Sequence, residues 1–245
     1  MKAVGVIPAR WASTRFEGKV LALLNGKPVI QHVWERAKKC RLLDEIIIAC
    51  DDERILTKAA EFGAKAVLTA VHHSSGTDRI AEAVSHIPCE IIVNIQGDEP
   101  LIQASVIDAL AEMMIKDSSC VMATVIKEIE HLTELSDPNV VKVVIDRNHD
   151  ALYFSRAPIP FLRDKKNTEM ARYYKHLGLY AYRRDFLFAF QRLPKSRLEQ
   201  LEQLEQLRVL EAGYKIKTIE THEESIGIDT PEDLKKAEAL SKLKI

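Results

Sequence analysis

Long apolar runs and an excess of charge of either sign are both missing from this 245-residue sequence. No stretch approaches the ~18 apolar residues that a membrane-spanning helix needs, and the first apolar run is too short for a signal peptide. We therefore expect a cytoplasmic protein with no membrane partner. The formal net charge is only -1, whereas a general nucleic-acid binder carries a basic excess. Nucleic acid is thus not an expected partner, and any anion site has to be a local cluster.

Paired cysteines are also missing. The four cysteines are scattered and form no Cys-x-x-Cys pair: Cys40, Cys50, Cys89 and Cys120. Two of them fall in apolar runs, where a free thiol behaves as a small hydrophobic side chain. We expect reduced, buried cysteines rather than a metal or redox site. A chain of this length buries enough apolar surface to fold without disulfides.

Short apolar runs alternate with longer helical patterns over residues 1–126. This alternation predicts an α/β fold, with a mostly parallel, Rossmann-like nucleotide-binding sheet and helices on both faces. Ligands of such sheets bind at the carboxyl ends of the strands, so the segments after Ile7 and Ile95 are the first places to look for chemistry. The predicted strands are 4–7, 46–50, 66–68, 91–95 and 121–125, and the predicted helices 29–40, 53–62, 78–85 and 105–116.

The pattern changes at about residue 127. Apolar runs at 140–145, 151–154 and 177–182 are separated by polar turns, which predicts a smaller antiparallel insertion over residues 127–192. Residues 1–126 and 193–245 would then form the nucleotide-binding domain. Such an insertion often serves as a lid or a dimer contact.

The tripeptide Leu-Glu-Gln occurs three times between Leu198 and Gln206. On one continuous helix, at about 100° per residue, the leucines would cover an arc of roughly 180°. Glu205 would lie inside this apolar arc, with Glu199 on the polar side. A carboxylate on an apolar face has to find partners or shift its pKa. Glu205 is therefore either a functional acid or a rim residue paired to a lysine.

A cationic segment follows the first predicted strand. Arg10, Arg15 and Lys19 lie within ten residues, with small side chains among them. Fixed cations and backbone N–H groups at a strand's carboxyl end suit a triphosphate, whose oxygens gain charge as pyrophosphate leaves. The glycines of a Walker loop or a dinucleotide fingerprint are missing. The segment is either an anion site of another kind or a solvated basic loop.

Two aspartates far apart in the sequence suggest a metal site. Asp98 follows the run 91–95, and Asp229 precedes a helix start whose capping is explained without it. Mg²⁺ takes carboxylate oxygens together with phosphate oxygens, so the pair indicates magnesium. Each aspartate alone is equally compatible with an ordinary turn or loop residue.

Further polar residues are candidates for binding a base, a ribose or an acidic acceptor. His72 and His73 lack a third metal ligand nearby and, as neighbours, point in different directions, which disfavours zinc. Three residues of the turn and helix that follow suit a base or ribose: Ser75, Gly76 and Arg79. Three residues of the insertion suit either an acidic acceptor or packing: Arg156, His176 and Tyr180.

Taken together, these stretches resemble the CMP-Kdo synthetases, the 3-deoxy-manno-octulosonate cytidylyltransferases. The matching strings keep the family's order from near residue 7 to residue 233, which is almost the whole chain. The most specific are Ala-Leu-Tyr-Phe-Ser-Arg at 151–156 and Gln-Gly-Asp-Glu-Pro at 96–100. One departure is Phe16-Glu17, where the family usually has Leu-Pro. Glu17 would place a negative charge beside the cationic segment, so its side chain has to point away or engage Lys19 or metal.

The resemblance implies a Mg²⁺-dependent transfer of CMP from CTP to the anomeric hydroxyl of Kdo, in lipopolysaccharide biosynthesis, by a homodimer whose insertion binds sugar. Because the sugar supplies the attacking atom, positioning and charge stabilisation would carry the reaction. By motif match, Arg10, Lys19, Asp98 and Asp229 would be catalytic, with both aspartates on Mg²⁺. The CTP ligands would be Arg10, Ser13, Arg15, Lys19, Ser75, Gly76, Arg79 and Gln96. The Kdo ligands would be Gln96, Arg156, His176, Tyr180, Glu205 and Gln206.

Three other classes of protein remain as alternatives. A cytidylyltransferase that activates sialic acid or a sugar-alcohol phosphate would lack the strings at 151–156 and 176–180. A glycosyltransferase would be expected to carry an Asp-x-Asp motif, whereas Gln96-Gly97-Asp98 offers one aspartate. A non-catalytic nucleotide sensor would not need two metal-binding aspartates.

Overall fold

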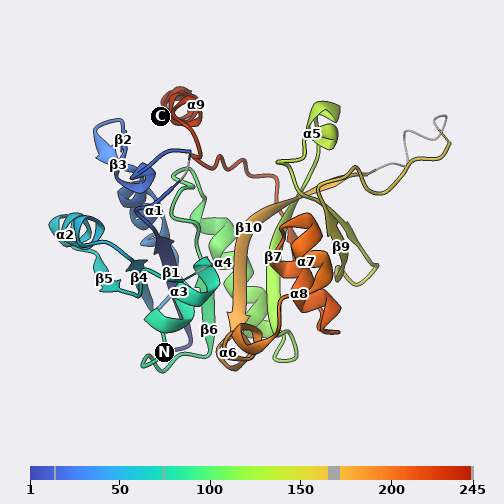
Figure 1. Ribbon diagram of the computed structural model, residues 1–245, viewed down its shortest axis with the longest axis horizontal. Coiled ribbons are helices and arrows are strands. Elements are labelled where there is room, and N and C mark those ends of the chain that lie inside the picture. Colours follow the sequence, from blue (N-terminus) through green and yellow to red (C-terminus); the bar gives the residue numbers. More distant parts are fainter. Residues whose placement is uncertain (14, 74, 165–171, 244–245) are drawn as a thin grey trace. The chain divides into compact units, whose positions relative to one another are not determined.

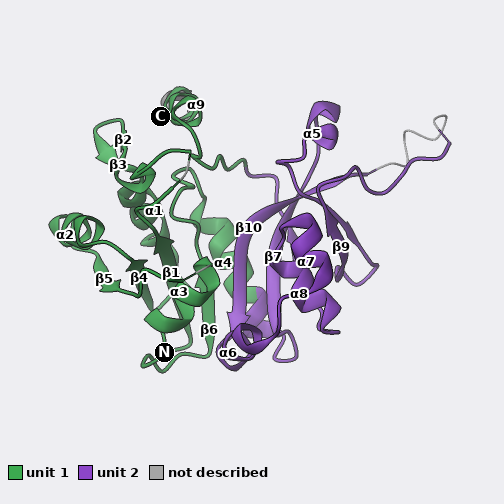
Figure 2. Ribbon diagram, viewed as in Figure 1, with its two compact units in different colours: residues 1–112, 224–245 green, residues 113–223 purple. Residues whose placement is uncertain are grey.

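The computed structural model describes residues 1–13, 15–73, 75–164 and 172–243 (Figure 1). The chain forms two compact units, residues 1–112 with 224–245 and residues 113–223 (Figure 2). These boundaries differ from those of the predicted nucleotide-binding domain and insertion, because strands and helices on both sides of 127–192 pack with the insertion. The functional roles given to the two regions stay predictions. Among the described residues, no helix is long and apolar enough to cross a membrane.

Unit 1, residues 1–112 and 224–245, is built on a parallel sheet. β1 (Ala3–Ala9) lies between β6 (Ile91–Asn94) and β4 (Glu45–Cys50), and β5 (Lys65–Leu68) pairs with β4. The apolar side chains of β1 and β6 are almost wholly removed from water, as expected for a parallel sheet covered by helices on its faces. The predicted α/β fold is confirmed.

Two helices of unit 1 begin at a side chain that accepts a hydrogen bond from one of their first backbone N–H groups. Asp52 accepts a hydrogen bond from the Arg54 N–H at the start of α2, and Ser75 accepts one from the Asp78 N–H at the start of α3. α2 is followed by Gly63, whose φ of 80° suits glycine. The helices are α1 (Val29–Ala37), α2 (Glu53–Glu61), α3 (Gly76–Ala83), α4 (Ala104–Lys116), which continues into unit 2, and α9 (Pro231–Leu243).

A small apolar cluster anchors the returning C-terminal segment within unit 1. Ile228 and Ala237 of this segment pack with Leu24 and Val29, and all four are fully buried. Leu24 belongs to the short hairpin of β2 (Leu23–Leu24) and β3 (Lys27–Pro28), which follows the 3-10 helix η1 (Lys19–Leu21). The cluster therefore holds residue 229 beside the segment that contains Lys19.

Unit 2, residues 113–223, is mainly antiparallel, as predicted for the insertion. β10 (Tyr174–Arg183) pairs antiparallel with β7 (Met122–Glu128) and β8 (Lys142–Ile145). β8 and β9 (Ala151–Ser155) form a hairpin, while β11 (Lys217–Glu220) runs parallel to β7. Helices α5 (Leu132–Ser136) and α6 (Arg184–Arg192) also belong to this unit.

The Leu-Glu-Gln segment is not one helix, so the predicted helical wheel is wrong. α7 (Arg197–Glu202) ends at Gln203, whose φ of 52° is left-handed, and α8 (Gln206–Glu211) starts anew. The break changes which face each acid occupies. Glu199, expected on the polar side, is buried and pairs with Arg208 at 2.5 Å.

Candidate active site

The cationic segment after β1 is shaped by two glycines. Gly97, in the turn after β6, faces the carbonyl oxygen of Pro8, and a Cβ at this position would lie 2.6 Å from that oxygen. Only glycine therefore lets the ends of β1 and β6 approach this closely. Gly18 has a φ of 65° and precedes η1, whose first residue is Lys19. The positive φ turns the chain so that Lys19 enters the protein instead of extending into solvent.

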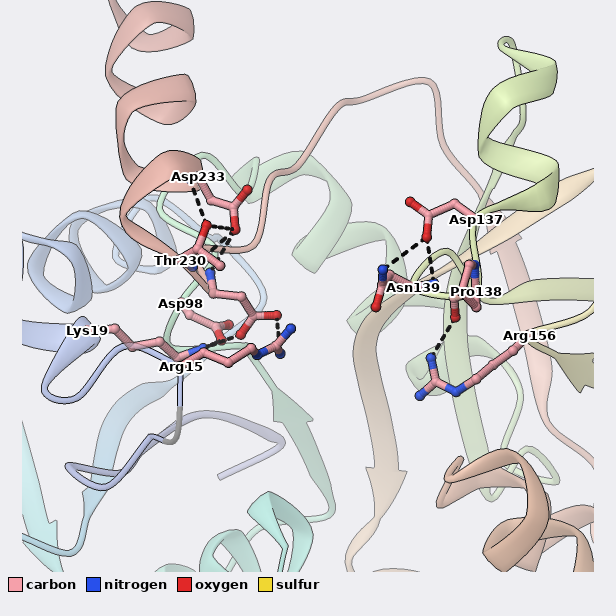
Figure 3. A network of polar contacts seen from close by, with 10 residues as sticks. Arg15, Lys19, Asp98, Asp137, Pro138, Asn139, Arg156, Thr230 and Asp233 are labelled. Atoms are coloured by element: carbon pink, nitrogen blue, oxygen red, sulfur yellow. Dashed lines mark hydrogen bonds and ion pairs between the residues drawn. The ribbon is translucent and has the colours of Figure 1, made fainter.

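Lys19 joins the two aspartates that the sequence identified as a pair. Its Nζ donates to Oδ2 of Asp98 at 2.5 Å and to Oδ1 of Asp229 at 2.8 Å, and its side chain is 8% exposed (Figure 3). Burial alone would lower the pKa of Lys19. The two carboxylates, Asp98 foremost, outweigh burial and hold this pKa above its ordinary value. Lys19 is therefore a fixed positive charge.

Backbone hydrogen bonds at Ile228 and at Asp229 itself hold Asp229 in place. The Ile228 N–H donates to the Asp98 carbonyl oxygen at 2.9 Å, and the Asp229 N–H donates to Asp233. Thr230 and Asp233 form a capping pair at the start of α9, so the cap is made without the Asp229 side chain. Arg15 donates to Oδ2 of Asp229 at 2.8 Å from a position that is 60% exposed.

A cavity of about 350 Å³ opens over this group of charges within unit 1. Most of the residues predicted for catalysis and CTP binding line it, although Ser13 and Arg15 are not among the described lining residues. His73 lines it too; its ring contacts Glu82, and the described residues contain no cluster of three or more side chains suited to a metal such as zinc. The predicted residues in the lining are Arg10, Lys19, Ser75, Gly76, Arg79, Gln96, Asp98 and Asp229.

Arg79 has structural partners as well as a place in the cavity wall. Its guanidinium donates to Asp51 Oδ2 at 3.0 Å and to Thr69 Oγ1 at 2.6 Å, and both charged side chains are nearly inaccessible. Asp51 also accepts from the Trp11 N–H at 2.8 Å. Sequence reasoning missed Asp51, although its position directly after β4 is the kind of place where it looked for ligands.

Glu17, the departure from the family pattern, points toward Trp11. The Trp11 indole N–H donates to Glu17 Oε1 at 2.8 Å. The Glu17 side chain thus points away from Lys19, which is one of the expected alternatives. Lys19 is directed to Asp98 and Asp229 instead.

Of the residues predicted to bind the sugar, Gln96 lines the cavity of unit 1. The others lie in unit 2, around β9, β10 and the break between α7 and α8. Arg156 spreads its guanidinium over backbone carbonyl oxygens, donating to Glu202 at 2.7 Å and Pro138 at 2.8 Å. Figure 3 shows the contact with Pro138. Glu202 in turn accepts from the Arg156 N–H at 2.9 Å. The break at Gln203 is thus fixed by the arginine.

His176 lies between aromatic rings. Phe154 and Tyr180 flank it with ring centroids 5.1 and 5.2 Å away, and its Nε2 contacts Thr124 Oγ1 at 2.9 Å. Burial lowers the pKa of His176 to about 3 and raises that of Tyr180. Both side chains are therefore neutral hydrogen-bonding groups near pH 7.

Glu205 and Gln206 stand at the start of α8. Glu205 lies 3.7 Å from Arg208, and 30% of its side chain is exposed. Gln206 is 4% exposed, and its Nε2 has no hydrogen-bond partner among the described residues. A buried amide donor without a partner is costly, which suits a group that a ligand completes.

Comparison with known proteins agrees with the fold. The cytidylyltransferase family model matches residues 4–226. A 3-deoxy-manno-octulosonate cytidylyltransferase from Geobacter metallireducens is 51% identical over the whole of both chains, and one from Solibacter usitatus is 53% identical over 100% of this chain and 96% of its own. A solved structure of CMP:2-keto-3-deoxy-manno-octonic acid synthetase complexed with CTP superposes with a TM-score of 0.95, at 45% identity and complete coverage of both chains.

The parallel sheet, with a cation-lined cavity at its carboxyl end, has the fold of the nucleotidyltransferases. The sequence identities of 51% and 53% over the full length of this chain identify one family within this class. The chain belongs to the 3-deoxy-manno-octulosonate cytidylyltransferase family.

Proposed function

We propose that the protein transfers CMP from CTP to 3-deoxy-manno-octulosonate and releases pyrophosphate. The observation that carries this proposal is the meeting of Asp98 and Asp229 at the Lys19 ammonium, inside a cavity lined by further residues predicted for the nucleotide. The choice of substrates is supported by the names and identities of the relatives, and by the similar solved structure, which is a complex with CTP.

In this reaction the anomeric hydroxyl of the sugar attacks the α-phosphorus, and pyrophosphate leaves. The protein needs no nucleophile of its own, so its residues orient the reactants and stabilise developing charge. Lys19 presents a fixed ammonium to the phosphate oxygens, and Arg10 and Arg15 add further cations. Ser75 and Gly76 lie at the start of α3, where the positive end of the helix dipole favours anionic or polar ligand atoms.

The residues around Lys19 fit Mg²⁺. Asp98 and Asp229 supply oxygen ligands, and both reach a single nitrogen atom, so they lie close enough to serve one site. Mg²⁺ prefers one or two carboxylates together with water and phosphate oxygens. When bound there, it would neutralise charge on the triphosphate.

The residues of unit 2 suit an acidic sugar. His176 and Tyr180 are neutral donors or acceptors for hydroxyl groups, and Gln206 offers an amide donor that ligand oxygen would satisfy. Arg156 matches the carboxylate of Kdo in charge and geometry. A homodimer that contributes to lipopolysaccharide biosynthesis in the cytoplasm is the setting we expect for this activity.

A pyrophosphate-release assay tests the proposal. Each of the four ribonucleoside triphosphates is combined with Kdo, sialic acid and a sugar-alcohol phosphate, with and without Mg²⁺. We expect release only with CTP, Kdo and Mg²⁺ together. Release with sialic acid but not Kdo would assign the protein to the related cytidylyltransferases, and release without an acceptor would indicate a hydrolase.

A further inference from the structure

Trp11, in the cationic segment, is held both on the face of its ring and at its indole nitrogen. Arg54 of α2 stacks on its ring, with the guanidinium carbon 3.5 Å from the ring centroid. The same guanidinium is fixed by Asp52 through bonds of 2.7 and 2.6 Å. Together with the bond from the indole N–H to Glu17, this holds the ring in one orientation. A cation over a tryptophan face is favourable in itself.

The ring lies directly against the residue that introduces Lys19. A Cβ at Gly18 would lie 2.8 Å from the Trp11 ring, and the Gly18 N–H donates to the Trp11 carbonyl oxygen at 3.0 Å. A movement of the ring would therefore shift Gly18, whose left-handed conformation aims Lys19 at the aspartates.

We propose that Glu17, through its hydrogen bond to Trp11, is a positioning residue that sets the location of the Lys19 ammonium. The inference rests on the proposed function, because its main readout is turnover of CTP and Kdo. It also gives a role to the residue that departs from the family pattern. An acceptor at Glu17, instead of a rigid proline, fixes the turn through the indole of Trp11.

The test compares substitutions that remove the bond with one that keeps it. Glu17→Ala removes the acceptor, Glu17→Gln keeps an oxygen acceptor without the charge, and Trp11→Phe keeps a stacking ring without the N–H. Glu61→Ala is the matched control, since it removes an exposed carboxylate paired with Lys58 on α2. For each, kcat is measured at saturating CTP and Kdo, alongside the melting temperature.

We expect Glu17→Ala and Trp11→Phe to lower kcat by roughly threefold to tenfold, which is the net worth of one hydrogen bond expressed as a rate. Glu17→Gln and Glu61→Ala should stay within about twofold of the wild type. Glu17→Ala should have no further effect in the Trp11→Phe background, because phenylalanine cannot donate. Equal effects of Glu17→Ala in both backgrounds, or a lower melting temperature with unchanged kcat, would overturn the inference.

A second readout does not depend on turnover. In a Trp34→Phe background, Trp11 is the remaining tryptophan of the two in the sequence. Its emission should shift to longer wavelength in Glu17→Ala and return toward the wild-type position in Glu17→Gln. Identical emission in all three would show that the bond is not formed. If the emission responds in this way but the wild type does not turn over CTP and Kdo, the hydrogen bond is confirmed and the proposed function fails. Turnover by the wild type without an emission response in the variants would remove the positioning role alone.

Discussion

Lys19 Nζ lies 2.8 Å from Oδ1 of Asp229, a residue 210 positions further along the chain. The contact joins two parts of unit 1 that are far apart in the sequence, the segment after β1 and the segment just before α9. It also places a cation where two carboxylates would otherwise repel each other. Structure and proposed chemistry thus depend on the same ammonium group.

Replacing Lys19 separates these two roles. Lys19→Met should lower kcat by roughly a hundredfold to a thousandfold, the usual cost of removing one group that stabilises transition-state charge. It also leaves Asp98 and Asp229 facing each other, so the variant should melt at a lower temperature without metal. Millimolar Mg²⁺ should raise its melting temperature more than that of the wild type. Lys27→Met, which removes an exposed ion pair with Glu35, is the control. An equal Mg²⁺ effect on all three proteins would contradict a shared metal site.

Asp98→Asn keeps the shape of the side chain and removes its charge. We expect turnover to fall by at least about a hundredfold, with little change in melting temperature, because Lys19 keeps Asp229 as a partner. The pyrophosphate-release assay and a thermal melt measure the two quantities. Wild-type turnover in this variant would refute the assignment of Asp98 to the metal.

Local pattern was enough to predict the sheet and to place Asp98 at the carboxyl end of a strand, whereas the pairing of Asp98 with Asp229 was a hypothesis from the chemistry of the two residues. Apolar runs alternating with helices define parallel strands, and the carboxyl ends of such strands gather their loops at one edge. The lysine between the aspartates was not foreseen as their joint partner. A contact between residues 19 and 229 depends on the packing of Ile228 against Leu24, which no local pattern encodes.

The Leu-Glu-Gln segment shows where periodicity fails. The helical wheel assumed one continuous helix, whereas Gln203 adopts a left-handed conformation. Arg156, 47 positions earlier, contacts the carbonyl oxygens of Glu202 and Gln203 at this break. Because a side chain far away in the sequence stabilises the break, the ten residues around Gln203 do not predict it. The burial of Glu199 against Arg208 follows from it.

The ion pair of Arg79 with Asp51 should contribute strongly to the stability of unit 1. Arg79→Met leaves the Asp51 carboxylate buried without its cation, which costs about 3–5 kcal/mol. The double variant Arg79→Met, Asp51→Asn should recover part of this loss. Urea unfolding without CTP measures the free energy of unfolding of each. Arg41→Met removes an arginine that is 91% exposed in its ion pair with Asp108, and should cost less than about 1 kcal/mol. A loss at Arg79 as small as that at Arg41 would mean that the pair is not desolvated.

His176 should make the stability of the protein depend on pH. Burial lowers its pKa to about 3 from the ordinary value of 6.5. Between these values the unfolded chain binds a proton at His176 that the folded chain does not. The free energy of unfolding should therefore fall as the pH drops through this window, with a slope from this group approaching about 1.4 kcal/mol per pH unit.

Comparison with His176→Gln isolates this contribution. Glutamine does not titrate but can still bond to Thr124 Oγ1, and the flanking Phe154 and Tyr180 carry no charge in this range. Urea unfolding of both proteins from pH 4.5 to 7 gives the two slopes. The wild type should lose stability faster than the variant below about pH 6.5, and His131→Gln, at an exposed position, should follow the wild type. Parallel curves for the wild type and His176→Gln would mean that the imidazole is accessible to protons in the folded protein, because only a desolvated ring resists protonation there.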